Sequence, residues 1–226
     1  MSSIITLNDS HHQEASLCLA TAFLNDPILG KHMFRQDYLK GSGASTLFAS
    51  VIENQFKGGQ HNCVAVNEKG VVQGVALWQG PDETQSVPIL TMLSVAPAIF
   101  GYSHIYRSIM GANAVEAKHP KYKHYYLAYV GVSPLCQGQG IGSALIKPVL
   151  QKADEEGIPC YLETGSPDNL PFYQKYGFKV TKQITILASS EVVVGTAPVG
   201  SPLILYCMKR EPARSKQSSK GSRTPK

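Results

Sequence analysis

The order of apolar and polar residues predicts three short strands and two helices in the first half of the chain. Apolar residues alternate or run together over 4–7, 63–66 and 71–78, which is typical of strands. Over 14–24 and 46–56 they recur every three or four residues, the period of one helix face. Turn residues Asn67 to Gly70 separate the second and third strands, so we expect a hairpin there.

In the second half, predicted strands alternate with predicted helices. Strands are expected over 125–132, 160–164, 178–187 and 203–208, and helices over 143–156 and 169–176. Pro148 lies inside the first of these helices and lacks a backbone donor, so we expect a kink or a restart there. Mixed strands with crossing helices predict one α/β (α+β) domain over residues 1–208. Residues 83–120 predict an inserted helical hairpin that could cover a substrate site.

Positive charge is concentrated at the C-terminal end. Residues 209–226 hold seven Lys or Arg and one Glu, whereas the whole chain carries a net charge of +5, so the remainder is close to neutral. Because this segment has few apolar residues, we expect a basic, disordered extension. The charge of the folded part gives no reason to expect a nucleic-acid partner.

Cysteine usage and hydropathy predict a cytoplasmic protein without a metal or a membrane partner. We also expect a monomer or a homodimer. The five cysteines are scattered and include no C-x-x-C pair, which argues against a disulfide framework and a cysteine zinc site. Seven histidines, including His104, His119 and His124, show no H-x-H or H-E-x-x-H spacing, which argues against a metal site. The first residues do not form a signal peptide, and no apolar run reaches the ~18 residues that span a bilayer.

A glycine-rich loop joins the strand 125–132 to the helix after it. It reads Gln137-Gly138-Gln139-Gly140-Ile141-Gly142 and leads into Ser143. Glycines let the backbone approach a ligand, and the unpaired N–H groups of a helix start favour an anion. The spacing is not that of a dinucleotide-binding fingerprint, and no Lys-Ser/Thr pair follows as in a P-loop. The loop therefore predicts a phosphate cradle without a side-chain cation, with a plain tight turn as the simpler alternative.

The signature formed by Gln137, Gly140 and Gly142 resembles that of the GNAT superfamily of acetyl-CoA-dependent N-acetyltransferases. Residues 122–180 look closest to its puromycin N-acetyltransferase-like branch, in the stretches AYVGVSPLCQGQGIGSALIKPVL and LETGSPDNLPFYQKYGFKV. Shorter patches at 22–27 and 75–81 resemble that branch too. The resemblance implies a twisted mixed sheet whose fourth and fifth strands splay apart to admit the cofactor.

The resemblance also implies a cofactor site. Backbone groups of Val130, Gly131 and Val132 would pair with the pantetheine arm like an added strand. The pyrophosphate would be held by amides of the loop residues Gln137, Gly138, Gln139, Gly140, Ile141, Gly142 and Ser143. Asn169 would bond the pantetheine arm, or else cap the helix that it begins.

The reacting groups implied by the resemblance are a tyrosine and a carboxylate. Tyr173 would be the general acid beside the cofactor sulfur, and its simpler role is core packing; Tyr176 is a weaker competitor that is expected to pack. Glu163, at the end of the predicted fifth strand, could accept the amine proton or hold an ammonium group, or be a surface charge. Trp78, Tyr102 and Tyr106 could line the acceptor pocket or belong to the core.

Together these residues predict an N-acetyltransferase that transfers the acetyl group of acetyl-CoA directly to the primary amine of a small molecule in a ternary complex. Two alternatives remain at the level of the sequence. One is acetylation of a protein or peptide amine, which would need an open groove. The other is a regulatory module that binds acetyl-CoA without turnover.

Overall fold

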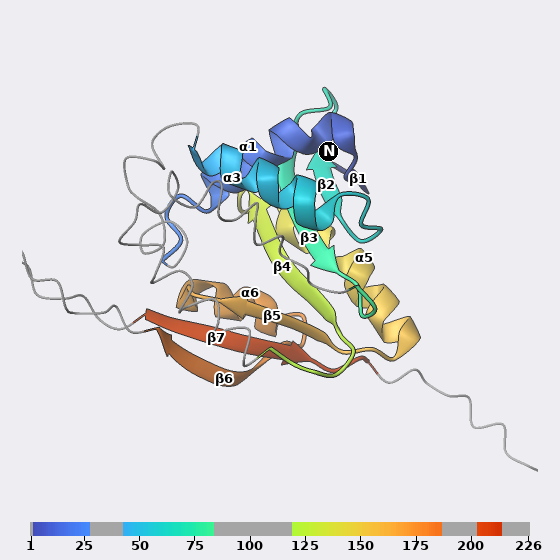
Figure 1. The fold of residues 1–226 in the computed structure, drawn as a ribbon, viewed down its shortest axis with the longest axis vertical. Helices are drawn as coiled ribbons and strands as arrows, with labels where there is room; N and C mark the ends of the chain where they lie inside the picture. The colour runs from blue at the N-terminus through green and yellow to red at the C-terminus, as the bar shows by residue number, and fades with distance from the viewer. Residues whose placement is uncertain (1, 28–42, 84–118, 187–202, 214–226) are drawn as a thin grey trace, which may run out of the picture.

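A seven-stranded mixed sheet forms the centre of the protein (Figure 1). The computed structural model describes residues 2–27, 43–83, 119–186 and 203–213. The strands lie in the order β1-β2-β3-β4-β5-β7-β6, and β4 and β5 are parallel whereas the other neighbours are antiparallel. Their bounds are Ser3–Thr6 (β1), Cys63–Val66 (β2), Val72–Gln79 (β3), Tyr125–Val132 (β4), Cys160–Thr164 (β5), Lys179–Ile186 (β6) and Leu203–Arg210 (β7).

The described helices fall where the apolar period placed them. Their bounds are His12–Ala22 (α1), Gly43–Val51 (α3), Ile141–Glu156 (α5) and Leu170–Gln174 (α6). Short helical turns lie beside them at Asp9–His11, Ile52–Phe56, Pro134–Cys136 and Pro167–Asn169. The mixed α/β fold expected from the sequence is confirmed. The hairpin predicted at 83–120 falls almost wholly on residues 84–118, outside the described residues.

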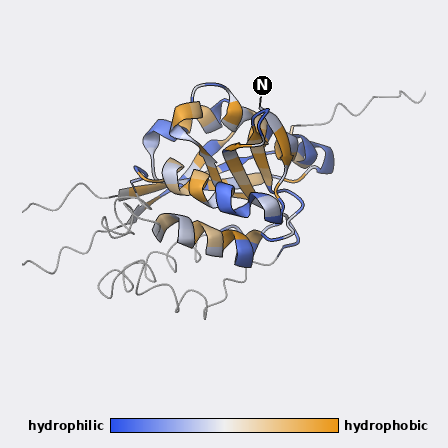
Figure 2. Ribbon diagram, turned by 90° about the horizontal axis from the view of Figure 1, so that it is seen from above, coloured by the Kyte–Doolittle hydropathy of each residue, from blue (hydrophilic) through white to orange (hydrophobic). Residues whose placement is uncertain are grey.

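Helices cover both faces of the sheet, with α1 and α3 over one face and α5 over the other (Figure 1). Two glycines of the sheet determine how closely α5 and α1 pack against it. A Cβ atom on Gly74 of β3 would lie 2.9 Å from side-chain carbons of Ile141 and Leu145 in α5. A Cβ atom on Gly131 of β4 would lie 2.9 Å from the Cβ atom of Ala22 in α1. Hydrophobic residues concentrate in the strands between the helices (Figure 2).

The core is continuous on the α5 face and divided on the other. On the α5 face one cluster joins residues from both halves of the sheet, among them Trp78, Leu145, Leu162 and Met208. On the α1 face one cluster lies under α1 and α3, and a separate smaller cluster lies on β5, β6 and β7. The two halves of the molecule are therefore joined mainly through α5.

Pro148 does not interrupt α5, which runs as one helix from Ile141 to Glu156; the predicted restart is not observed. Pro148 has no N–H to donate to the carbonyl of Ala144, one turn earlier in the helix. In this turn the thiol of Cys63 donates to the carbonyl of Leu145, with 3.4 Å between sulfur and oxygen. Pro148 is exposed, so its ring displaces no core side chain.

β7 continues to Arg210, past the boundary predicted at residue 208. Arg210 forms two hydrogen bonds to the carboxylate of Asp154 in α5, at 2.8 and 2.6 Å. Its Nε also donates to the carbonyl of Tyr176, at 2.8 Å. The end of β7 is thereby fastened to α5. Among the described helices, each is too short or too polar to cross a lipid bilayer.

Candidate active site

β4 and β5 separate after only three paired residues. Tyr125, Tyr126 and Leu127 of β4 pair with the first three residues of β5, and the pairing then ends. At the same point β4 carries a bulge at Ala128, because Leu77 pairs with Tyr129 and Trp78 with Leu127. A bulge increases local twist and so turns the strand away from its neighbour. The splay expected from the sequence is confirmed.

The segment Val130 to Val132 lies beyond this branch point. It pairs with β3 on one side and with no described strand on the other. The side-chain amide of Gln137 donates to the carbonyl of Val132, at 3.1 Å, and so ties the loop to the strand end. An extended ligand could add to the open side of β4 as a strand would.

The glycine-rich loop is exposed and ends at the start of α5. Gly138 and Gly140 have φ angles of +76° and +81°, in the left-handed region that favours glycine. No heavy atom lies within 4 Å of a Cβ built on either residue, so the space above the loop is open. Gly140 is the N-cap of α5 and no side chain caps this end. The first N–H groups of α5 are left for a ligand, because helix geometry gives them no internal partner.

Packing against the sheet holds the start of α5 in place. Ile141 is buried and, with Leu145, lies against Gly74 of β3. Gly142 and Ser143 follow in the first turn and are half-buried. The structure thus brings the predicted loop residues, including the exposed Gln139, to the same end of β4 as Val130–Val132.

Tyr173 of α6 is buried in the core cluster on the α5 face of the sheet. Its ring contacts Phe172 and Phe178 edge-on, with centroids 5.1 and 6.0 Å apart. Burial raises the pKa of its hydroxyl, and the nearby charge of Asp26 beyond the end of α1 raises it further. The phenol is therefore neutral and able to donate at physiological pH.

Asn169 and Tyr176, which flank Tyr173 in the sequence, have structural contacts. The side-chain amide of Asn169 donates to the hydroxyl of Thr164 at 3.2 Å and does not cap α6. Tyr176 packs against Phe172 with ring centroids 5.5 Å apart, as expected for the weaker competitor of Tyr173.

Glu163 lies on β5 one residue past the last pair with β4. Its side chain is only 6% exposed, and its Oε1 lies 3.5 Å from Nδ1 of His119. This oxygen is buried without a hydrogen-bond partner in the described part of the chain. The surface-charge alternative is therefore wrong, because the carboxylate is enclosed.

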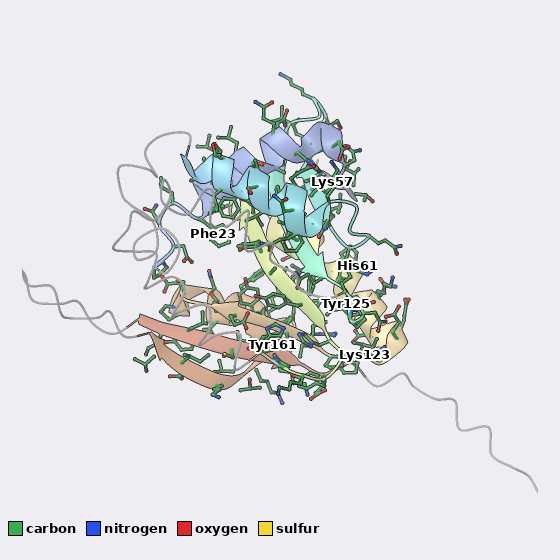
Figure 3. The ribbon with its side chains drawn as sticks, viewed as in Figure 1. Phe23, Lys57, His61, Lys123, Tyr125 and Tyr161 are labelled. Carbon is green, nitrogen blue, oxygen red and sulfur yellow. The ribbon has the colours of Figure 1, made fainter. Side chains whose placement is uncertain are left out.

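Aromatic rings surround this carboxylate. His119 contacts Tyr126 and Tyr161 edge-on, with centroids 4.8 and 5.2 Å apart, and Tyr161 is labelled in Figure 3. Burial, and secondarily the charge of Glu163, raises the pKa of both tyrosines. The sequence considered His119 and His124 only as metal ligands, and their position beside Glu163 was missed. The described residues contain no group of side chains arranged to bind a metal ion.

Trp78 and two tyrosines were candidates for the acceptor pocket. Trp78 is fully buried in the core under α5, on the face away from Glu163, so it does not line that side of the site. Tyr102 and Tyr106 lie outside the described residues.

Comparison with known proteins assigns the chain to a family. A model of the acetyltransferase (GNAT) family matches residues 31–178, which include the splayed strands, the glycine-rich loop and α6. The chain belongs to the acetyltransferase (GNAT) family. Membership implies an N-acetyltransferase enzyme, and GNAT enzymes use acetyl-CoA.

Individual relatives agree with this GNAT assignment. An uncharacterised N-acetyltransferase of Schizosaccharomyces pombe is 26% identical over 194 residues, which is 80% of this chain and 76% of the relative. A solved structure described as histone acetyltransferase HPA2 and related acetyltransferase, from Corynebacterium glutamicum, has a TM-score of 0.62 at 25% identity and covers 95% of this chain and 98% of its own. The polyamine N-acetyltransferase of Drosophila melanogaster has a TM-score of 0.61 at 14% identity, covering 93% and 100%, and shares the fold.

Proposed function

We propose that this protein transfers the acetyl group of acetyl-CoA to the primary amine of a small molecule, by direct attack in a ternary complex. The observation that supports a small molecule as the acceptor is the enclosed carboxylate of Glu163. Its Oε1 is buried without a hydrogen-bond partner among the described residues and has the rings of His119, Tyr126 and Tyr161 around it. A carboxylate among aromatic rings suits a compact ammonium group, through an ion pair and cation–π contacts.

The donor would lie between the splayed strands. Val130–Val132 would pair with the pantetheine arm, and the amides from Gln137 to Ser143 would hold the pyrophosphate. The open space around Gly138 and Gly140 supports this placement. The side chain of Asn169 is occupied by Thr164, so a bond from Asn169 to the pantetheine arm would have to replace that contact.

The transfer needs two proton movements. Glu163 would take one proton from the ammonium group, and the neutral amine would then attack the thioester carbon. As the carbon–sulfur bond breaks, Tyr173 would donate to the leaving sulfur, and the second amine proton would restore the phenol. Because the phenol is a weaker acid than a thiol, this donation must accompany bond cleavage and cannot precede it.

The test is thiol release from acetyl-CoA with a panel of acceptors. The panel holds agmatine, spermidine and tyramine as small amines, and short peptides with a free N-terminus or a lysine. We expect a small amine to release thiol above background. Thiol release with the peptides but with none of the small amines would favour the protein-acceptor alternative. If no acceptor in the panel causes thiol release while coenzyme A still binds, the regulatory alternative would be favoured.

Two substitutions test the assigned roles with the best acceptor of the panel. Tyr173→Phe should lower kcat by about 100-fold, within the range of general acid catalysis, whereas Tyr176→Phe serves as the control and should retain activity. Glu163→Gln should lower kcat/KM most at low pH, where the amine is protonated. Full turnover by Tyr173→Phe would refute the general-acid role.

A further inference from the structure

A chain of polar contacts leads from Glu163 to the protein surface. Oε1 of Glu163 lies 3.5 Å from Nδ1 of His119. Nε2 of His119 lies 3.0 Å from Nε2 of His124. Nδ1 of His124 lies 2.7 Å from the carbonyl oxygen of Tyr122, a contact at the exposed surface before β4. Three short steps therefore connect an enclosed carboxylate with solvent.

The chemistry of these contacts fixes where the protons can be. A carbonyl oxygen only accepts, so Nδ1 of His124 carries a proton. In a neutral His124 ring Nε2 must then accept, and the proton in the contact between the histidines belongs to Nε2 of His119. A neutral His119 ring would thus turn the lone pair of its Nδ1 toward Glu163. This lone pair agrees with the lack of a hydrogen bond between Nδ1 of His119 and Oε1 of Glu163 at rest, and it can receive a proton that Glu163 takes up.

A proton that Glu163 takes from the amine then has three successive positions. It can reside on the carboxyl group of Glu163, with both rings neutral. It can move to Nδ1 of His119, which makes an imidazolium that still donates through Nε2. It can pass on when His119 gives its Nε2 proton to Nε2 of His124, which leaves His119 neutral and His124 charged. Two proton transfers thus move one positive charge from the site to the surface without any ring movement.

We propose that Glu163, His119 and His124 form a proton relay that carries the proton of the acceptor amine from the active site to solvent. This inference rests on the proposed function. Transfer of an acetyl group from acetyl-CoA to an ammonium group yields an amide, a thiol and one free proton. The second amine proton ends on the thiol, and the first must leave the enclosed site before the next turnover. A swing of the His124 ring into solvent would release it, and His119 would then exchange its Nδ1 proton for one on Nε2, which restores the starting tautomer.

The surroundings favour a one-way path. Burial lowers the pKa of His124; the hydrogen bond to Tyr122 opposes this shift, nearby His119 adds to it, and the charge of Glu163 opposes it more weakly. His124 is thus neutral at rest and gives up an added proton readily. Of the other titratable groups near the relay, Tyr126 and Tyr161 are phenols with raised pKa values. Cys207 lies beside Tyr161, and Lys209, which packs 4.5 Å from the centroid of the Tyr122 ring, is paired with Glu211 at 2.6 Å.

The tautomer of His124 tests the relay without any acceptor. In the full chain with ¹⁵N-labelled histidine, nuclear magnetic resonance at neutral pH should show His124 protonated on Nδ1 and not on Nε2. The opposite tautomer would overturn the proposal, because the contact with the Tyr122 carbonyl and the direction of the transfers would be lost. This measurement uses the wild-type protein and is independent of whether acetyl transfer occurs.

A pH–rate profile with the best acceptor of the panel tests whether protons pass through His119 and His124 during turnover. His124→Ala should lower kcat/KM about tenfold near neutral pH, and the difference should shrink as the pH approaches the ~10 of a free amine. Added imidazole should restore much of the loss, because it can accept the proton from His119. A profile parallel to that of the wild type, or no response to imidazole, would overturn the relay.

His61 supplies the matched control. It also contacts a tyrosine of β4 edge-on, at 5.2 Å from Tyr125, and burial lowers its pKa too (Figure 3). It belongs to no contact of the relay. His61→Ala should keep the wild-type pH dependence and show no response to imidazole.

Discussion

At the scale of single residues, glycine identity carried the prediction of the cradle, because only a few backbone conformations require glycine. Gly138 and Gly140 have positive φ angles and open space around them. Glycine is therefore favoured at both positions because of the backbone conformation and not because a side chain would clash. The relay is different. The spacing of His119 and His124 does not point to Glu163, because the carboxylate that lies beside His119 belongs to β5, which comes later in the chain. Sequence reasoning could therefore find Glu163 but not its partners.

A matched pair of substitutions separates backbone strain from ligand binding. Gly140→Ala and Gly70→Ala both place a side chain at positive φ, +81° and +79°, with no atom within 4 Å. Each should lower the free energy of unfolding by about 1–2 kcal/mol, measured by urea denaturation. Only Gly140→Ala should weaken coenzyme A binding, by about tenfold or 1.4 kcal/mol in calorimetry. Equal affinities in the two variants would mean that the cradle lies elsewhere.

At the scale of elements, period and turn chemistry were sufficient for every described strand and for α1, α3, α5 and α6. The bounds of β4 and β5 agree with the sequence because both are short apolar runs closed by turn residues. The end of β7 was missed, since Lys209 and Arg210 read as the start of a basic segment. Their place in the strand depends on Asp154, a tertiary partner that a local pattern does not contain.

The contact between α5 and β7 gives a pH-dependent prediction. The hydrogen bond from Arg210 lowers the pKa of Asp154, so its contribution is complete above the unfolded pKa of ~3.9 and is lost as the pH falls through the lower folded value. Asp154→Asn should therefore cost about 1.5–3 kcal/mol of unfolding free energy at pH 7, and less at pH 3. Urea denaturation at both pH values measures this.

An exposed ion pair is the control for that measurement. Glu53 and Lys57 form a pair with side chains 49% exposed, where solvent screens the charges. Glu53→Gln should leave the unfolding free energy nearly unchanged at both pH values. An equal loss in Glu53→Gln and Asp154→Asn would contradict the special role of the α5–β7 contact.

At the scale of the whole molecule, the folded body and the basic segment should be separable. A chain ending at Ala213 keeps β7. It also keeps the hydrogen bond from the backbone N–H of Ala213 to the carboxylate of Asp154, at 2.6 Å. We expect it to unfold at the same temperature as the full chain and to retain thiol release. A chain ending at Met208 loses Arg210 and should melt several degrees lower in calorimetry. A lower melting temperature of the chain that ends at Ala213 would show that residues 214–226 support the fold.

The divided core of the α1 face has a consequence for how the protein responds to its ligand. A sheet in which β4 and β5 pair over only three residues would be expected to unfold in two steps, one for each half. The unbroken cluster under α5 instead links the halves, so a single cooperative transition is expected. Coenzyme A bound between the splayed strands would form hydrogen bonds with the open side of β4, where β5 no longer pairs with it. Its binding should then raise the melting temperature of the molecule as one unit, and amide hydrogen exchange should slow in β5, β6 and β7 as well as in β4.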